Sequence, residues 1–326
     1  MIVKQSKAKK PSYIVYYNRR STNYEKLDEW VRTPLSELAK KQGREVVYLE
    51  VKPVFDDTIK AIACEKQISD GDIVAACGGD GTLSAVLNGL IVGNKKVDLL
   101  LMPLGNSNDT LGSMGKKSLI TDIKRVLGKK PIPYMPIDML INGKHAYWAL
   151  HDFTVGHIAN IGYVLNYASR KAKREGRKGI NELKEILGYY FDEALPRPDG
   201  GLGEFVDENG ERKKFGILAV VLGRLGGAWF PRIDGRVVRS LHRGSDIAVL
   251  EGNLIGKTLV DIPSIVAWMF RGLHARMATH AVFTFDKPVK NMRIVVDGEI
   301  FNFKNVRKIE GVRRKSNLRL YVPSEK

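Results

Sequence analysis

The stretch at residues 72–89 constrains the fold of this chain more than any other, because its pattern predicts a buried strand, a glycine turn and a helix. Residues 73–77 are apolar without polar alternation, which is typical of a parallel strand covered on both faces. Gly78, Gly79 and Gly81 follow. Glycine permits positive φ and close approach of the backbone, so amides of this turn and of the helix N-terminus can bind an anion such as a phosphate.

Two polar residues of the same turn add candidate contacts. Asp80 can orient a magnesium ion or a hydroxyl group, whereas Thr82 suits either a helix N-cap or a contact with phosphate. A glycine pattern of this kind is weak evidence when taken alone, so a plain strand-to-helix turn remains the alternative interpretation.

Residues 1–133 predict an amino-terminal, mostly parallel α/β domain, because strand-like apolar runs alternate with helix-like periodicity. The strands are expected at 12–17, 44–51, 73–77 and 98–102, and the helices at 24–41 and 56–67. In open sheets of this type, ligands bind at the carboxyl ends of the strands. We therefore expect Asn18, the turn at 78–82 and the loop at 105–109 to converge on one crevice.

Residues 134–326 predict a β-rich, sandwich-like second domain, with the final strands packing back on the first domain. We expect strands at 135–141, 145–153, 215–222, 247–250, 281–285 and 292–303, and helices at 160–173, 181–194 and 264–276. Residues 196–210 are rich in glycine, proline and aspartate and predict a mobile loop.

A second polar loop follows the predicted strand at 98–102 and has the sequence Pro-Leu-Gly-Asn-Ser-Asn-Asp. Gly105 permits close approach of the backbone, while Asn108 supplies an amide and Asp109 a carboxylate. The alternative for this loop is a polar turn that caps the next helix.

A third candidate lies in the segment at 293–301, where two apolar runs are joined by Asp-Gly. This dipeptide is a strong signal for a β-hairpin. The hairpin brings Asp297 and Glu299 close together, where they can serve a metal ion or a substrate hydroxyl. A general base must lie within about 3 Å of the proton that it takes.

The chain of 326 residues carries a formal net charge of +17, which implies anionic partners such as nucleic acid, a phospholipid surface or a nucleotide. Basic clusters lie at 170–178, 211–214 and 307–319, and no recognised nucleic-acid module accompanies them. The two cysteines, Cys64 and Cys77, lie in apolar surroundings and favour a reducing cytosol. No run approaches the ~18 apolar residues that span a bilayer, so we expect a cytoplasmic protein that associates peripherally with membranes.

Three motifs in a fixed order carry a resemblance to a known family: Gly-Gly-Asp-Gly-Thr at 78–82, Pro-x-Gly-x-x-Asn-Asp at 103–109 and Asp-Gly-Glu at 297–299. With them, the chain resembles the diacylglycerol kinase catalytic-domain family of lipid kinases, which is related to sphingosine kinases and more remotely to NAD kinases. Asn88-Gly89 is similar to the pair that ends the family's helix. The resemblance spans about residues 12–303.

The resemblance implies ATP bound in the crevice between the two domains and magnesium-dependent phosphorylation of a lipid hydroxyl in phospholipid biosynthesis. The acceptor would be diacylglycerol, a related glycerolipid or a long-chain base at an anionic membrane surface, and a homodimer is one expected assembly. The implied catalytic residues are Glu299 as the base, Asp80 and Asp297, and Asp246 is an implied metal ligand. The implied nucleotide-binding residues are Asn18, Gly78, Gly79, Asp80, Gly81, Thr82, Gly105, Asn108 and Asp109.

Two other functions compete with a lipid kinase. NAD kinases share the Gly-Gly-Asp-Gly-Thr motif but lack the loop found here at 103–109. A kinase fold that has lost catalysis and only binds lipid or nucleotide is the second alternative, because the chain departs from the family pattern at Arg19, Arg20, Ser84, Ala85 and Asn106. The acidic residues retained in the three motifs argue against this loss.

Overall fold

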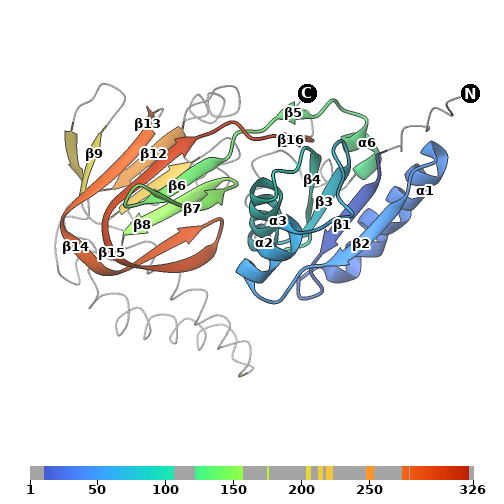
Figure 1. Cartoon of the computed structure of the whole chain (residues 1–326), viewed down its shortest axis with the longest axis horizontal. Helices are drawn as coiled ribbons and strands as arrows, with labels where there is room; N and C mark the ends of the chain where they lie inside the picture. Colours follow the sequence, from blue (N-terminus) through green and yellow to red (C-terminus); the bar gives the residue numbers. More distant parts are fainter. Residues whose placement is uncertain are drawn as a thin grey trace, which may run out of the picture. The chain divides into compact units, whose positions relative to one another are not determined.

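The computed structural model describes residues 11–105, 122–156, 175, 203–206, 212–215, 218–222, 247–252, 274–278 and 280–322. The chain divides into two compact units, which are Met1–Tyr134 with Lys315–Lys326 (unit 1) and Met135–Arg314 (unit 2). The helices expected at 160–173 and 181–194 lie outside the described residues. Each unit has its own sheet (Figure 1).

Unit 1 is built on a mostly parallel six-stranded sheet, as the alternation of strands and helices predicts. Its strands are β1 (Tyr13–Tyr17), β2 (Val46–Glu50), β3 (Ile73–Gly78), β4 (Asp98–Pro103), β5 (Ile132–Pro133) and β16 (Arg319–Leu320). Their order is β2-β1-β3-β4-β16-β5, and β5 runs antiparallel to β16. Because β3 pairs with β1 on one side and β4 on the other, Tyr17, Cys77 and Met102 lie side by side near the carboxyl ends.

The helices of unit 1 are α1 (Thr33–Gln42), α2 (Phe55–Ala63), α3 (Asp80–Val92) and α6 (Ile123–Leu127). Figure 1 shows α2 and α3 on the opposite side of the sheet from α1 and α6. The expected helix at 24–41 begins irregularly, with a 3-10 turn at Tyr24–Lys26 and a π turn at Asp28–Arg32. Pro34 explains this start, because proline has no N–H to donate to the preceding turn.

Gly89 lies inside α3 and does not end it, contrary to the expectation for Asn88-Gly89. A Cβ atom at this position would lie 2.6 Å from Cβ of Ile62, so the absence of a side chain allows α2 to pack closely on α3. Helix α3 is buried at every position from Leu83 to Leu90. A helix that is buried on all sides in this way belongs in the interior of a unit.

Unit 2 contains an antiparallel ten-stranded sheet, in agreement with the predicted β-rich domain. Its strands are β6 (Ile137–Ile141), β7 (Lys144–Ala149), β8 (Asp152–Gly156), β9 (Gly203–Val206), β10 (Arg212–Phe215), β11 (Leu218–Leu222), β12 (Ile247–Gly252), β13 (His274–Ala278), β14 (His280–Val296) and β15 (Glu299–Arg313). The order β13-β12-β11-β8-β14-β15-β6-β7 places the long hairpin β14–β15 in the middle, with β9 paired to β14. Phe153, Phe283 and Ile294 lie in the core.

Three sequence predictions for unit 2 are wrong. The single strand expected at 145–153 is two strands, β7 and β8, which a short loop at residues 150–151 separates. The helix expected at 264–276 does not extend to its predicted end, because residues 274–276 belong to β13. Part of the loop expected at 196–210 is strand β9. In the second and third cases, pairing with β12 and β14 overrides the local preference of the sequence.

Among the described residues, no helix has both the length and the apolar character needed to cross a membrane.

Candidate functional site

The glycine turn of unit 1 joins the end of β3 to the start of α3. Gly79 is the N-cap residue, and no side chain caps this end of the helix. The first helical hydrogen bond runs from the N–H of Leu83 to the carbonyl of Gly79, at 3.0 Å. The first-turn amides have no carbonyl acceptor inside the helix, and together with the helix dipole they favour a bound anion.

Gly78 is required by the close packing of Thr82 against the turn. A Cβ atom at position 78 would lie 2.5 Å from Cβ of Thr82 and 2.7 Å from its Oγ1. The carbonyl of Gly78 accepts hydrogen bonds from the N–H of Leu104 at 3.0 Å and of Gly105 at 3.1 Å. Because Gly79 is the N-cap, Thr82 is not, and the side chain of Thr82 packs against Gly78.

Asn18 connects the loop after β1 to the glycine turn. Its Nδ2 donates to Oγ1 of Thr82 at 3.0 Å, and its backbone N–H donates to the carbonyl of Cys77 at 3.2 Å. A Cβ atom at Gly79 would lie 3.4 Å from Cα of Gly105. The structure thus brings Asn18, the residues 78–82 and Gly105 together at one edge of the sheet.

Ser21 is a further residue at this edge and lies in the loop that follows β1. Its hydroxyl oxygen is buried and has no hydrogen-bond partner within the described part of the chain. A hydroxyl donor and uncapped helix amides fit the oxygens of a phosphate group. The predicted site residues Asn108, Asp109 and Asp246 lie outside the described residues.

The Asp-Gly turn of unit 2 joins β14 to β15, as the sequence predicts. Both turn residues have positive φ, 48° for Asp297 and 80° for Gly298, which the tight turn of a two-residue hairpin requires. Glu299 is the first residue of β15, is partly buried and pairs with Val296 across the turn. The direction of the Glu299 side chain therefore depends on the conformation of the turn.

The carboxylate of Asp297 is fully buried and binds the loop between β7 and β8. Its Oδ2 accepts from the N–H of Leu150 at 2.7 Å, and its Oδ1 accepts from the N–H of His151 at 2.8 Å and of Asp152 at 3.2 Å. Burial raises the pKa of Asp297, but hydrogen bonds and charge from His151 and the backbone amides outweigh it, so the pKa is lowered. The contacts of this carboxylate explain why the strand is interrupted at residues 150–151.

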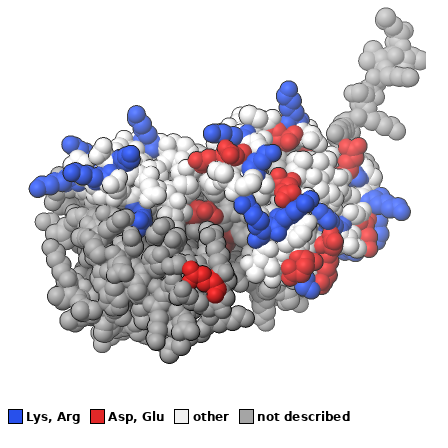
Figure 2. Space-filling view, turned by 90° about the horizontal axis from the view of Figure 1, so that it is seen from below, with Lys and Arg blue, Asp and Glu red and all other residues white. Residues whose placement is uncertain are grey.

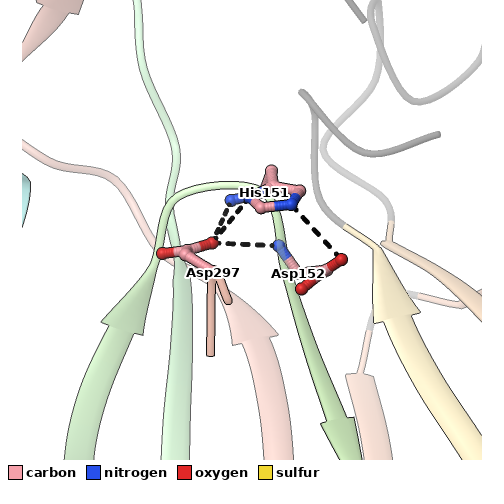
Figure 3. A group of neighbouring side chains, drawn as sticks. All are labelled: His151, Asp152 and Asp297. Carbon is pink, nitrogen blue, oxygen red and sulfur yellow. Dashed lines mark hydrogen bonds and ion pairs between the residues drawn. The ribbon is translucent and has the colours of Figure 1, made fainter. Parts of the chain in front are cut away.

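His151 lies between two carboxylates (Figure 3). Its Nδ1 is 2.9 Å from Oδ1 of Asp297, and its Nε2 is 3.3 Å from Oδ2 of Asp152. Sequence reasoning missed both His151 and Asp152, because their partner is 145 or 146 residues away in the chain.

The same three side chains offer ligand atoms within 4.8 Å of one another, which is close enough to test them as a metal site. The donor set fits a metal poorly, because both oxygens of Asp297 already accept backbone N–H groups. A metal ion bound to this carboxylate or to Nδ1 would have to displace these hydrogen bonds. We therefore assign the cluster to holding the loop.

The chain is similar to known proteins in the segment that contains the glycine turn and in its fold. The model of the diacylglycerol kinase catalytic domain matches residues 12–135. None of the curated proteins matches the chain. Among solved structures, a protein from Bacillus anthracis str. Sterne assigned as a diacylglycerol kinase has a TM-score of 0.57 at 13% identity, with 95% of this chain and 96% of that chain covered.

A further structure assigned as a diacylglycerol kinase from the same organism has a TM-score of 0.61 at 14% identity, with 97% of this chain and 98% of that chain covered. At such low identity these likenesses show the fold. The segment at 12–135, which contains the glycine turn, thus matches the diacylglycerol kinase catalytic domain, and the chain has the fold of the bacterial diacylglycerol kinase structures.

Proposed function

We propose that this protein is an ATP-dependent, magnesium-requiring kinase that phosphorylates the hydroxyl of a lipid, with diacylglycerol as the first candidate. The observation that carries the proposal is the glycine turn at 78–82, built at the carboxyl ends of β1, β3 and β4 within the matched family segment. Phosphoryl transfer depends mainly on positioning and on neutralising charge, and backbone amides at a helix N-terminus contribute to both.

Each motif has a role in this proposal. The turn at 78–82 with Asn18 and Gly105 binds the phosphates of ATP, and Asp80 orients either the metal ion or the acceptor. Magnesium, when bound, offsets the charge of the phosphate oxygens. Glu299 takes the proton from the lipid hydroxyl as the oxygen of that hydroxyl attacks the γ-phosphorus, and the bond from that phosphorus to the β–γ bridging oxygen breaks, so that ADP leaves. Asn108 and Asp109 complete the nucleotide site, and Asp246 is a candidate metal ligand.

An assay with a panel of acceptors tests the function. Labelled γ-phosphate is offered as ATP with magnesium to mixed micelles of diacylglycerol or a long-chain base and, separately, to NAD. We expect a labelled lipid and unlabelled NAD. Label in NAD alone would establish an NAD kinase, and ATP binding without transfer to any acceptor would establish a binding module.

We further propose that the protein meets its acceptor at an anionic bilayer. Support comes from exposed cations near the irregular part of hairpin β14–β15, where the pairing shifts register between Thr284 and Val289. There the side chain of Asn142 binds the backbone of residues 305, 307 and 308. These cations are Lys144, Lys287, Lys290, Lys304 and Arg307, and none of them forms an ion pair with another residue that the structure describes. At the left end of Figure 2, over unit 2, basic side chains lie together, and no acidic side chain of the described residues lies beside them in this view.

Vesicle binding tests this docking surface. In the hairpin variant, four cations are changed to Gln: Lys287, Lys290, Lys304 and Arg307. The control variant carries the same change at four cations of unit 1: Lys26, Lys40, Lys41 and Lys60. Each cation near an anionic membrane contributes about 1 kcal/mol, so the hairpin variant should bind phosphatidylglycerol vesicles at least tenfold more weakly. Equal loss in both variants, or binding to nucleic acid but not to vesicles, would contradict the proposal.

A further inference from the structure

The turn that precedes Glu299 is held from outside the hairpin. Asp297 donates its own N–H to the carbonyl of Asp152 at 3.1 Å, and its carboxylate accepts from three N–H groups of the loop at 150–152. Strand β8 begins at the end of that loop and pairs with β14, where Phe153 is the partner of Val296. The loop, the turn and the first residue of β15 therefore form one connected unit.

The contacts of Asp297 limit its role in catalysis. Oδ1 already accepts from two backbone amides and from His151, and Oδ2 accepts from the N–H of Leu150. The residue is 0% exposed. A fully buried carboxylate whose two oxygens bind protein N–H groups is suited to positioning its neighbours and not to taking a proton from a substrate.

His151 completes this arrangement on the other side of the carboxylate. Both of its ring nitrogens face carboxylate oxygens, at 2.9 Å and 3.3 Å (Figure 3). An N–H on Nδ1 can donate to Oδ1 of Asp297. The residue is nearly buried, at 5% exposure, so water competes little for its contacts with the two aspartates.

We propose that His151 is a positioning residue for the phosphoryl transfer, acting through Asp297. The ring, held between Asp297 and Asp152, fixes the Asp297-Gly298 turn and thereby the direction of Glu299. This inference rests on the proposed function, in which Glu299 takes the proton of the acceptor. It assigns Asp297 to positioning, in place of the catalytic role implied by the family resemblance.

Two substitutions of His151 separate positioning from bulk. In His151→Asn, the side-chain amide nitrogen takes the place of Nδ1 and keeps the donor to Asp297. In His151→Leu, a side chain of similar size has no donor. We expect His151→Leu to lower kcat for the lipid acceptor tenfold to a hundredfold with KM for ATP within twofold, and His151→Asn to restore at least a third of wild-type kcat.

Amide hydrogen exchange without any substrate gives a second measurement, independent of activity. The N–H groups of Leu150 and His151 should exchange at least tenfold faster in His151→Leu than in the wild type, while those of β3 in unit 1 should be unchanged. Wild-type kcat together with wild-type exchange in His151→Leu would overturn the inference. A loss of kcat that His151→Asn does not restore would overturn it as well.

The same two measurements distinguish failure of this inference from failure of the proposed function. If the wild-type protein transfers phosphate to no acceptor, the kinase proposal fails and His151 has no transfer to support. Faster exchange in His151→Leu would then still establish the contact between the loop and the turn. If the wild type is active and His151→Leu is equally active, the kinase proposal stands and the positioning role is wrong.

Discussion

The glycine turn of unit 1 and the Asp-Gly turn of unit 2 both place polar groups at the ends of strands, but different forces hold them. The first is defined by small residues and backbone bonds, with Gly78 in contact with Thr82 and its carbonyl bound by Leu104 and Gly105. The second is defined by one buried carboxylate, Asp297, which binds three amides and His151.

This difference predicts different sensitivities in the two turns. A turn that depends on close packing tolerates little added volume, because the atoms in contact belong to a short side chain that cannot move aside. A turn that depends on a buried charge tolerates changes of volume better than loss of the charge, because the donors around it remain buried without an acceptor. The following substitutions test each sensitivity separately.

Asp297→Ala should have the largest effect on stability. It leaves the N–H groups of Leu150 and His151 and the ring of His151 without their acceptor, and it places alanine at a φ of 48°. Breaking a buried charged pair costs about 3–5 kcal/mol, which urea unfolding of the variant should show. A loss below about 1 kcal/mol would mean that the carboxylate does not hold the loop.

Gly78→Ala should come next, with a loss of about 1–3 kcal/mol from overpacking against Thr82 and a weaker affinity for ATP. Gly79→Ala is the matched control, because its added Cβ meets only Cα of Gly105, at 3.4 Å, and its φ is −84°. Urea unfolding measures both variants, and an ATP titration measures Gly78→Ala. Equal losses of stability at the two glycines would show that contact with Thr82 does not decide the conformation of the turn.

The stability contributed by Asp297 should disappear in acid. Because the pKa of Asp297 is lowered in the folded protein, its contribution is complete above the unfolded value of about 3.9 and is lost as the pH falls through the folded value. Asp297→Asn keeps the turn and an oxygen acceptor and should be about 1–3 kcal/mol less stable near pH 7. The difference in free energy of unfolding between the variant and the wild type should narrow below about pH 4. A difference independent of pH would show that the charge of Asp297 does not contribute to stability.

Thr82→Val should have the smallest effect, about 1 kcal/mol, because it removes the acceptor for Nδ2 of Asn18 at nearly constant volume. Thr82→Ser, which keeps the hydroxyl, is the control. Urea unfolding measures the stability of both, and an ATP titration separately reports any contact of the hydroxyl with nucleotide. If both variants match the wild type in stability, the hydrogen bond to Asn18 contributes nothing measurable.

Both turns follow from the local sequence. The apolar run at 73–77 and the glycines after it predict strand, turn and helix from adjacent residues, and the structure agrees. The Asp297-Gly298 hairpin is equally local. The convergence of Asn18 with the glycine turn follows from the general rule for parallel sheets, because strand ends meet at one edge.

The contacts that the sequence did not predict join distant segments. The break between β7 and β8 arises because Asp297 binds amides that lie 145–147 residues earlier, and no local pattern at 145–153 indicates it. The prediction of apolar surroundings was also wrong for Cys64, because this residue is exposed at the end of α2. Cys77, in contrast, is buried. Burial raises the pKa of Cys77, as expected for a thiol inside a sheet.

The most direct test of the central claim is the single substitution Glu299→Gln, with ATP binding and phosphate transfer to the lipid acceptor measured on the same preparation. The claim is that unit 1 binds the nucleotide and that Glu299 of unit 2 takes the proton. Loss of a general base typically costs about 10²–10⁴-fold in rate. We therefore predict ATP affinity within twofold of the wild type and transfer at least a hundredfold slower, whereas transfer at the wild-type rate would contradict the account.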